Sequence, residues 1–134
     1  MTTPARFERA FEVEVADIDG LGHVNNLVYL RWVQDVAAAH WRFAATPEQQ
    51  DAVVWVAVRH EIDYKAPAFA REQIVARTWV EEWTGVTSDR HTEIVRPSDG
   101  KLLAKARTLW CAVDPESMRP KRVDPEVRAL FVAG

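Results

Sequence analysis

The sequence predicts an α+β fold in which one long helix accompanies a five-stranded antiparallel sheet. Five segments alternate apolar and polar residues, which is the pattern of a half-buried strand. One segment near the N-terminus instead repeats apolar residues at every third or fourth position, which is the pattern of a helix. Most connections between the strands are short turns, whereas parallel strands need crossovers of about a dozen residues. The sheet is therefore expected to be antiparallel.

The strands are placed by this alternation and by the turn residues between them. We expect them over residues 7–16, 54–64, 72–82, 86–96 and 102–113. Gly85 supplies the turn into the fourth strand, and Asp99-Gly100 predicts a hairpin turn before the fifth. A polar loop is expected before the second strand, and a short helical turn is expected at residues 127–132 of the proline-punctuated tail.

The first two strands are assigned by their alternate apolar residues. In the first, Phe11, Val13 and Val15 alternate with glutamates. Pro67 stops the second strand, because proline lacks the N–H that a central strand needs. The apolar face expected for the second strand comprises Val54, Val56, Val58, His60, Ile62 and Tyr64.

The helix is expected over residues 24–44, with Asn25 or Asn26 capping its start and Thr46-Pro47 marking its end. Its apolar stripe comprises Val28, Trp32, Val33, Val36, Ala37, Ala39, His40 and Trp41. A stripe this wide has to be covered by the sheet wrapping around the helix or by a partner subunit. His40 is expected to be a core histidine whose hydrogen bonds are satisfied.

Composition limits the classes of protein that the chain can belong to. A chain of 134 residues is predicted to form one domain, residues 1–134. Its apolar runs are far shorter than the ~20 residues of a membrane span, and its N-terminus lacks the apolar core of a secretion signal, so we expect a cytoplasmic protein. Cys111 is the only cysteine, which excludes an intrachain disulfide. The net charge of −3 provides no basic surface, so nucleic acid is not expected as a partner.

Residues 17–29 carry the groups that suggest chemistry. They include two carboxylates, Asp17 and Asp19, two glycines, a histidine and two asparagines at the expected helix start. A helix N-terminus has backbone N–H groups without intrahelical partners, and these can stabilise an oxygen that gains negative charge. Acyl transfer needs a carboxylate beside such donors, because the carboxylate attacks or activates water while the donors hold the oxyanion.

Structural and metal-binding roles are the alternatives for the same residues. Turn and capping roles alone would also account for Asp17 and Asp19. A calcium loop is excluded, because Leu21 and Val28 stand where oxygen ligands are required. No pair of histidines has the spacing of a zinc site, no serine lies in a Gly-x-Ser-x-Gly motif, and Cys111 is expected to be a packed thiol. No metal site is predicted.

The segment DIDGLGHVNN at residues 17–26, followed by Tyr29 and Trp32, resembles the signature of the hotdog-fold acyl-CoA thioesterases, in the 4-hydroxybenzoyl-CoA thioesterase branch. The resemblance extends over nearly the whole chain, because residues 62–67 resemble the end of that family's second strand and residues 85–88 its turn into the fourth. It implies a five-stranded antiparallel sheet curled around the long helix. It also implies that two subunits pair their sheets and form active sites at their interface.

The resemblance further implies roles for individual residues. Asp19 would be the catalytic carboxylate, either as nucleophile on the thioester carbon or as general base for water, and the backbone N–H of Asn26 would polarise the thioester carbonyl. Asp17 remains the alternative acid. The residues expected to bind the substrate are Gly22, His23, Asn25, Tyr29, His60, Thr87, Ser88 and Arg90.

The expected substrate is a thioester of coenzyme A or of acyl carrier protein, with coenzyme A only as part of the substrate and no other cofactor. Some members of the family hold coenzyme A phosphates with basic side chains at the turn between the third and fourth strands, but residues 83–86 contain none. Arg90 is the candidate for that contact, and acyl carrier protein is the alternative carrier. We do not infer from the resemblance that the acyl group is aromatic. We expect a homodimer or a dimer of dimers, that is, a homotetramer.

Two other functions stay open. A catalytically silent hotdog module would bind acyl-CoA or serve in assembly, although such a module has no chemical need for Asp19 beside a capped helix. A dehydratase acting on hydroxyacyl thioesters would need a histidine and an acid facing each other across the interface. His60 is the candidate histidine for that reaction.

Overall fold

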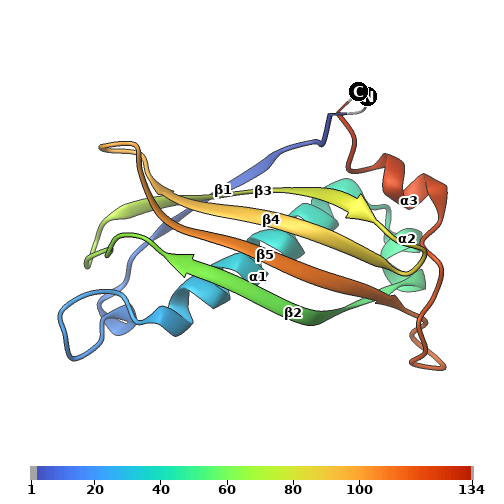
Figure 1. Ribbon diagram of the computed structural model, residues 1–134, viewed down its shortest axis with the longest axis horizontal. Helices are drawn as coiled ribbons and strands as arrows, with labels where there is room; N and C mark the ends of the chain where they lie inside the picture. The colour runs from blue at the N-terminus through green and yellow to red at the C-terminus, as the bar shows by residue number, and fades with distance from the viewer. Residues whose placement is uncertain (1–2, 134) are drawn as a thin grey trace.

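The computed structural model describes residues 3–133, in which a long helix crosses one face of a five-stranded antiparallel sheet (Figure 1). The strands are β1 (Phe7–Glu12), β2 (Val54–Tyr64), β3 (Gln73–Trp83), β4 (Thr87–Arg96) and β5 (Lys101–Val113), and their order in the sheet is β1-β3-β4-β5-β2. The helices are α1 (Asn26–Ala44), α2 (Pro47–Ala52) and α3 (Pro125–Ala129), and a single 3-10 turn, η1 (Val15–Asp17), follows β1. The predicted α+β architecture is confirmed.

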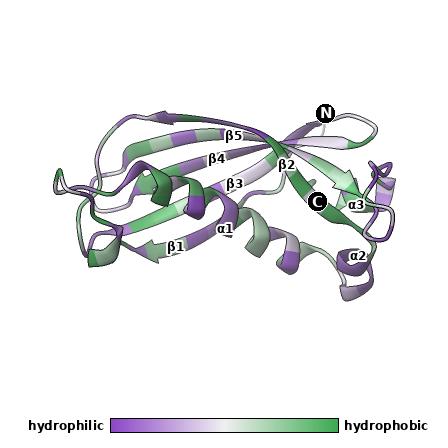
Figure 2. Cartoon of the chain, turned by 90° about the horizontal axis from the view of Figure 1, so that it is seen from below, coloured by the Kyte–Doolittle hydropathy of each residue, from purple (hydrophilic) through white to green (hydrophobic). Residues whose placement is uncertain are grey.

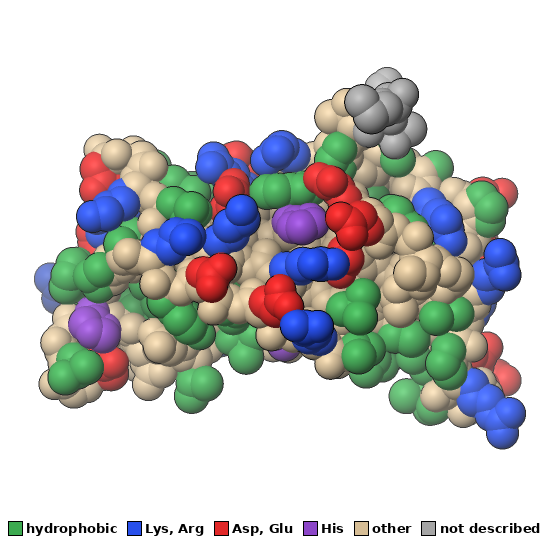
Figure 3. Space-filling view, in the orientation of Figure 1, with side chains coloured by type: hydrophobic (Ala, Val, Ile, Leu, Met, Phe, Trp, Pro, Cys, Tyr) green, Lys and Arg blue, Asp and Glu red, His purple; other side chains and the backbone are tan. Residues whose placement is uncertain are grey.

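The two faces of the sheet differ because α1 runs beneath only one of them (Figure 2). The opposite face carries charged side chains of both signs (Figure 3). On β3, β4 and β5, Arg77 Nε lies 2.8 Å from Glu93 Oε1, and Arg107 Nη2 lies 2.6 Å from Asp89 Oδ2. Neighbouring strands thus pair their charges on the solvent side, and the inner face holds the core.

The core consists of two apolar clusters at opposite ends of α1. The cluster at the start of α1 includes Val28, Tyr29, Trp32, Ile74, Ala76 and Leu103. The cluster at the end of α1 includes Val53, Val80, Ala112, Val127 and Phe131. Buried polar side chains separate the two, since on β3 the fully buried Thr78 lies between Ala76 of the first cluster and Val80 of the second.

The first strand and the long helix are shorter than predicted. β1 ends at Glu12, because the chain turns there into η1 and leaves Val15 66% exposed. α1 begins at Asn26, since Asn25 has the extended backbone of a helix cap. The expected assignment of Val15 to a buried strand face was therefore wrong, whereas the expected end of α1 at residue 44 was correct.

The segment predicted as a polar loop forms the short helix α2. Thr46 Oγ1 accepts a hydrogen bond of 3.2 Å from the Gln49 N–H, and the Thr46 N–H donates one of 2.9 Å to Gln49 Oε1. This capping box, with Pro47 in the first turn, specifies a helix without any apolar stripe. The helical turn of the tail is α3, which begins slightly earlier than predicted. None of the helices within residues 3–133 is long and apolar enough to cross a membrane.

β2 forms as predicted, but a bulge changes which of its residues face α1. The pairing of β2 with β5 shifts register between Ala57 and Arg59. One extra residue reverses the alternation of a strand, so Trp55 packs against the core before the bulge and Ile62 packs against it after the bulge. The residues predicted to lie inside but left exposed are Val54, Val56, Val58 and Tyr64, at 38%, 41%, 61% and 46%.

Candidate functional site

The loop before α1 is closed into a tight hairpin by its own backbone. Ile18 and Val24 form an antiparallel bridge, the Asp19 N–H donates to the His23 carbonyl at 2.9 Å, and the Gly22 N–H donates to the Asp19 carbonyl at 3.2 Å. Gly22 has a φ of 86°, a conformation that costs other residues about 1–2 kcal/mol. The glycine predicted as part of the site is therefore required by the turn.

The carboxylate of Asp19 is fixed on this hairpin and stays accessible. Its Oδ1 accepts a hydrogen bond of 2.8 Å from the Leu21 N–H, and its side chain is 25% exposed. His23 Nδ1 lies 3.7 Å from Asp19 Oδ2 and 3.3 Å from the Val24 carbonyl oxygen. One oxygen is thus held by the loop while the other faces His23 and solvent, an arrangement that leaves a lone pair free for chemistry.

The start of α1 presents an unpartnered backbone donor seven residues after Asp19. Asn25 Oδ1 accepts from the Leu27 N–H at 2.9 Å, and the Asn25 carbonyl accepts from the Val28 N–H at 2.9 Å. The Asn26 N–H, by contrast, has no acceptor within residues 3–133, and Asn26 is exposed. The Asn25 N–H donates to the Asp17 carbonyl at 2.9 Å, which ties the helix start to the base of the hairpin that carries Asp19.

Asp17 has a structural environment instead. It is 4% exposed, its Oδ1 accepts from Arg31 Nη2 at 2.9 Å, and its Oδ2 accepts from the Glu14 N–H at 3.0 Å. Both oxygens are therefore engaged in holding the loop to α1. This environment favours Asp19 over Asp17 as the reactive acid.

Two tyrosines pack beneath the helix start. Tyr29 is 3% exposed and its hydroxyl donates to the Ala66 carbonyl at 3.4 Å, and burial raises the pKa of this phenol. The Tyr64 hydroxyl donates to the Asn26 carbonyl at 3.3 Å and its ring meets that of Tyr29 edge-on. Tyr64 thus contacts the residue that carries the candidate donor. It was not predicted as a site residue, because 38 residues separate it from Asn26 and no local pattern links the two.

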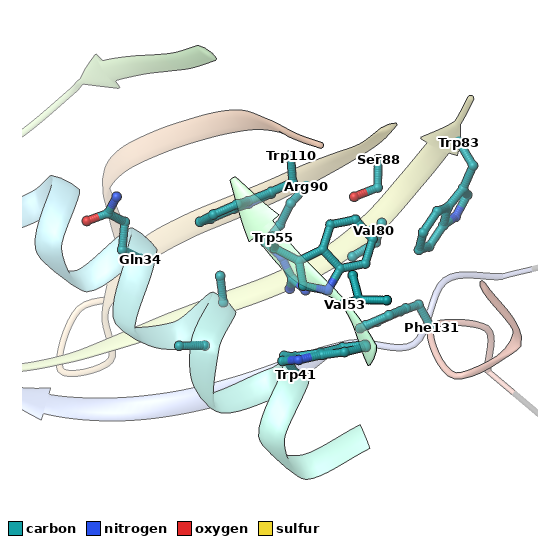
Figure 4. Close-up of a pocket in the computed structure, with 12 residues that line it drawn as sticks. Gln34, Trp41, Val53, Trp55, Val80, Trp83, Ser88, Arg90, Trp110 and Phe131 are labelled. Carbon is teal, nitrogen blue, oxygen red and sulfur yellow. The ribbon is translucent and has the colours of Figure 1, made fainter. Parts of the chain in front are cut away.

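A separate cavity of about 310 Å³ lies at the other end of α1, between the helix and the sheet (Figure 4). Its walls are mainly aromatic, with Trp41, Trp55, Trp83, Trp110 and Phe131. Ser88 and Arg90, both on β4, also line it. Thr87 lies at the start of β4, where its N–H donates to Thr84 Oγ1 at 3.0 Å. The predicted site residues on β4 are therefore not brought together with Asp19.

Arg90 is buried against a neutral histidine. Its Nη1 lies 2.9 Å from His40 Nδ1 and 3.1 Å from Thr78 Oγ1. Arginine can only donate, so His40 Nδ1 accepts and His40 is neutral. Burial and the nearby Arg90 charge lower the pKa of His40 to about 3, and burial lowers the pKa of Arg90 to about 9. His40 is confirmed as a core histidine whose Nδ1 is hydrogen-bonded, and Arg90, at 5% exposure, lies too deep for solvated coenzyme A phosphates.

His60 lies behind the cavity wall, where its ring meets that of Trp110 edge-on with 6.4 Å between the ring centroids. Its Nδ1 lies 2.9 Å from Thr108 Oγ1, and burial lowers its pKa. His60 makes no ion pair with a carboxylate of the described chain. Nor does any cluster of potential metal ligands occur among residues 3–133.

Comparison with known proteins identifies relatives of the whole chain. A model of the thioesterase-like superfamily matches residues 13–131. The Bacillus subtilis protein YneP, provisionally named an acyl-CoA thioesterase, is 29% identical over 116 residues that cover 84% of this chain and 83% of YneP. The chloroplastic oleoyl-acyl carrier protein thioesterase 2 of Arabidopsis thaliana is 25% identical over 129 residues, which cover 92% of this chain and 35% of that protein.

Solved structures share the fold at lower identity. The crystal structure of Slr0204, a 1,4-dihydroxy-2-naphthoyl-CoA thioesterase from Synechocystis, matches with a TM-score of 0.83 and 18% identity. The match covers 94% of this chain and 95% of that one. The sheet wrapped around one long helix is thus a known arrangement, in agreement with the predicted hotdog fold.

Proposed function

The chain belongs to the thioesterase-like superfamily, and we propose that it hydrolyses acyl thioesters to a free acid and a thiol. The observation that carries this proposal is the pairing of an accessible carboxylate, Asp19, with the unpartnered N–H of Asn26 at the start of α1. A thioester carbonyl placed between them would meet an attacking group on one side and an oxyanion donor on the other.

The reaction needs one base or nucleophile and one donor. Along one route, an Asp19 oxygen attacks the thioester carbon, the thiolate leaves and takes a proton from water, and water then hydrolyses the mixed anhydride. Along the other, Asp19 takes a proton from the attacking water, the C–S bond breaks in the tetrahedral intermediate, and the thiolate leaves and is protonated. Both routes place negative charge on the carbonyl oxygen, which the Asn26 N–H and the α1 dipole stabilise.

The residues around this pair position it. His23 lies beside Asp19 Oδ2, Asn25 fixes the first turn of α1, and Gly22 permits the hairpin. Tyr64, which donates to the Asn26 carbonyl, holds the same peptide segment from the β2 side. Tyr29 supports this contact from the core and does not face the substrate directly.

A second copy of the chain is expected to complete the site. β2 is an edge strand whose Val54, Val56 and Val58 are exposed, and exposed apolar edge strands pair readily with another strand. We therefore place the subunit contact at β2. Val56→Lys is expected to shift sedimentation towards the monomer, and an unchanged sedimentation coefficient would contradict this placement.

The carrier is proposed to be coenzyme A, in line with the provisional name of YneP, while the Arabidopsis relative makes acyl carrier protein the alternative. The test is a thiol-release assay over short, long, branched and aromatic acyl-CoAs, together with acyl carrier protein thioesters. Thiol release that depends on Asp19 supports the proposal. Binding of these thioesters without thiol release across the whole panel would instead identify a silent acyl-CoA-binding module.

A further inference from the structure

The cavity at the end of α1 has the size of a small-molecule site. Its volume of about 310 Å³ is roughly twice the ~150 Å³ that holds a benzene molecule. Four tryptophans and Phe131 supply flat apolar walls, and Arg90 and Ser88 reach among them from β4 (Figure 4). The cavity therefore suits an apolar body of one or two rings or a short chain.

Arg90 brings to this cavity a charge that has no carboxylate partner, although its guanidinium carbon lies 5.6 Å from the centre of the Phe131 ring. The Nη1 group of Arg90 is occupied by His40 and Thr78, but its Nε and Nη2 groups make no hydrogen bond within residues 3–133. None of the carboxylates in that range forms an ion pair with it, since the neighbouring Asp89 points to the other face and pairs with Arg107. A buried cation without an anion is costly to a fold.

A second donor accompanies Arg90. The Ser88 side chain is 4% exposed and its hydroxyl makes no hydrogen bond in the described chain. Arg90 lies two residues along β4 on the same face, about 7 Å away. The Trp110 Nε1–H also lacks an acceptor within residues 3–133, but it is buried away from the cavity. Arg90 and Ser88 thus offer hydrogen bonds to the cavity, and an anion with two acceptor oxygens matches them.

We propose that this cavity binds an organic carboxylate, with its apolar body among the tryptophans and its carboxylate on Arg90 and Ser88. Arginine suits this role because its planar group donates two parallel hydrogen bonds to a carboxylate. A bound anion also compensates the Arg90 charge, which burial otherwise disfavours.

The test compares an acid with its uncharged amide. In isothermal titration calorimetry, wild-type protein is expected to bind 3-phenylpropionate at least about tenfold more tightly than 3-phenylpropionamide, because charge-assisted hydrogen bonds are the stronger ones. The four wall tryptophans give a second readout, since binding should change their fluorescence. Equal affinity for the acid and the amide would overturn the proposal.

Variants locate the binding. Arg90→Met is expected to weaken acid binding by about tenfold to a hundredfold while leaving amide binding unchanged. Arg107→Met, which removes a cation from the outer face of the same sheet, is the matched control and should bind as wild type. If Arg90→Met does not fold, Ser88→Ala replaces it, with an expected loss of about threefold. Unchanged acid binding in a folded Arg90→Met, or in Ser88→Ala, would contradict the assignment.

A kinetic arm identifies the source of the carboxylate. If the carboxylate is the far end of an acyl group, CoA thioesters of carboxylate-ended acyl groups are hydrolysed faster than methyl-ended ones, and Arg90→Met removes the difference. If it belongs to a free acid, that acid alters the hydrolysis of a methyl-ended thioester, and Arg90→Met abolishes the effect. This arm rests on the proposed hydrolysis, whereas the calorimetry does not, so the failure of one proposal is distinguishable from the failure of the other.

Discussion

The two ends of α1 are built in opposite ways. At its start, polar groups are held on an exposed hairpin, the free donor is a backbone N–H, and Asp19 does not line the aromatic cavity. At its end, polar side chains are buried, and Arg90 and Ser88 line that aromatic cavity.

The two proposals assign the reaction to the start of α1 and ligand recognition to its end. A reacting carboxylate needs access to water and a rigid loop, while a recognition site needs shape and exclusion of water. Asn26 and His40, which mark the two ends, are separated along the helix by about 21 Å at 1.5 Å per residue. Within one copy of the chain, only an extended ligand can touch both ends.

The largest expected effect concerns Asp19. Asp19→Asn keeps the hydrogen bond from the Leu21 N–H but removes the negative charge, so kcat should fall by about a thousandfold or more. The melting temperature should stay near that of wild type, because this side chain is partly exposed. Thiol-release kinetics and a thermal melt on the same preparation check both expectations.

The matched control for Asp19→Asn is Asp35→Asn, which removes a carboxylate from α1 that makes no ion pair within residues 3–133. It should leave turnover within about twofold of wild type. Equal losses in the two variants would mean that net charge, and not the position of Asp19, matters.

Asp17 should affect stability and not chemistry. Asp17→Asn weakens the hydrogen bonds to Arg31 and to the Glu14 N–H, and charge-assisted bonds of this kind contribute about 1–3 kcal/mol. Urea denaturation should show that loss in the free energy of unfolding, with kcat changed far less than in Asp19→Asn. A kcat loss as large as that of Asp19→Asn, in folded protein, would restore Asp17 as the catalytic acid.

A pH-dependent loss of stability is expected at the buried end, from the titration of His40. Its folded-state pKa of about 3 lies below the ordinary 6.5, so between these values the unfolded chain binds the proton and the folded chain does not. The stability contributed by neutral His40 is complete above pH 6.5 and is lost as the pH falls towards 3, with a slope of up to ~1.4 kcal/mol per pH unit.

His40→Gln offers the comparison, because its amide oxygen can still accept from Arg90. Urea denaturation of both proteins from pH 7 to pH 4 should show wild-type stability declining more steeply than that of the variant. Parallel pH profiles would show that His40 is protonated alike in the folded and unfolded states.

The sequence was most informative where structure depends on local pattern. The strands from β2 to β5, the long helix and the hairpin before it all follow from alternation, helical spacing and turn residues. Polar residues concentrated in one short segment also pointed to Asp19, Asn25 and Asn26 as candidate site residues, and that assignment stays a prediction.

The remaining features depend on contacts between distant segments or on small departures from pattern. The bulge at Ala57 has no turn residue to mark it, so the exposure of the valines before it could not be predicted. The β4–β5 register, which brings Trp110 beside Ser88, and the approach of Arg90 to His40 from 50 residues away have no local signal. For that reason the sequence did not predict the cavity, although Ser88 and Arg90 were both predicted to bind substrate.

The central claim, that the first amide of α1 is the oxyanion donor, is tested most directly by Asn26→Pro. Among the backbone donors, proline removes only this N–H. Proline is well tolerated at the first helical position. Asn25 already has the extended backbone that proline requires in the preceding residue. The Asn26 carbonyl that accepts from Tyr64 is retained. Asn26→Ala, which keeps the N–H and removes the side chain, is the control.

The measurement is kcat for thiol release by the two variants, with circular dichroism to confirm that the helix is intact. A lost oxyanion donor predicts a fall of about a hundredfold to a thousandfold for Asn26→Pro and little change for Asn26→Ala. Wild-type turnover in a folded Asn26→Pro protein would contradict the account.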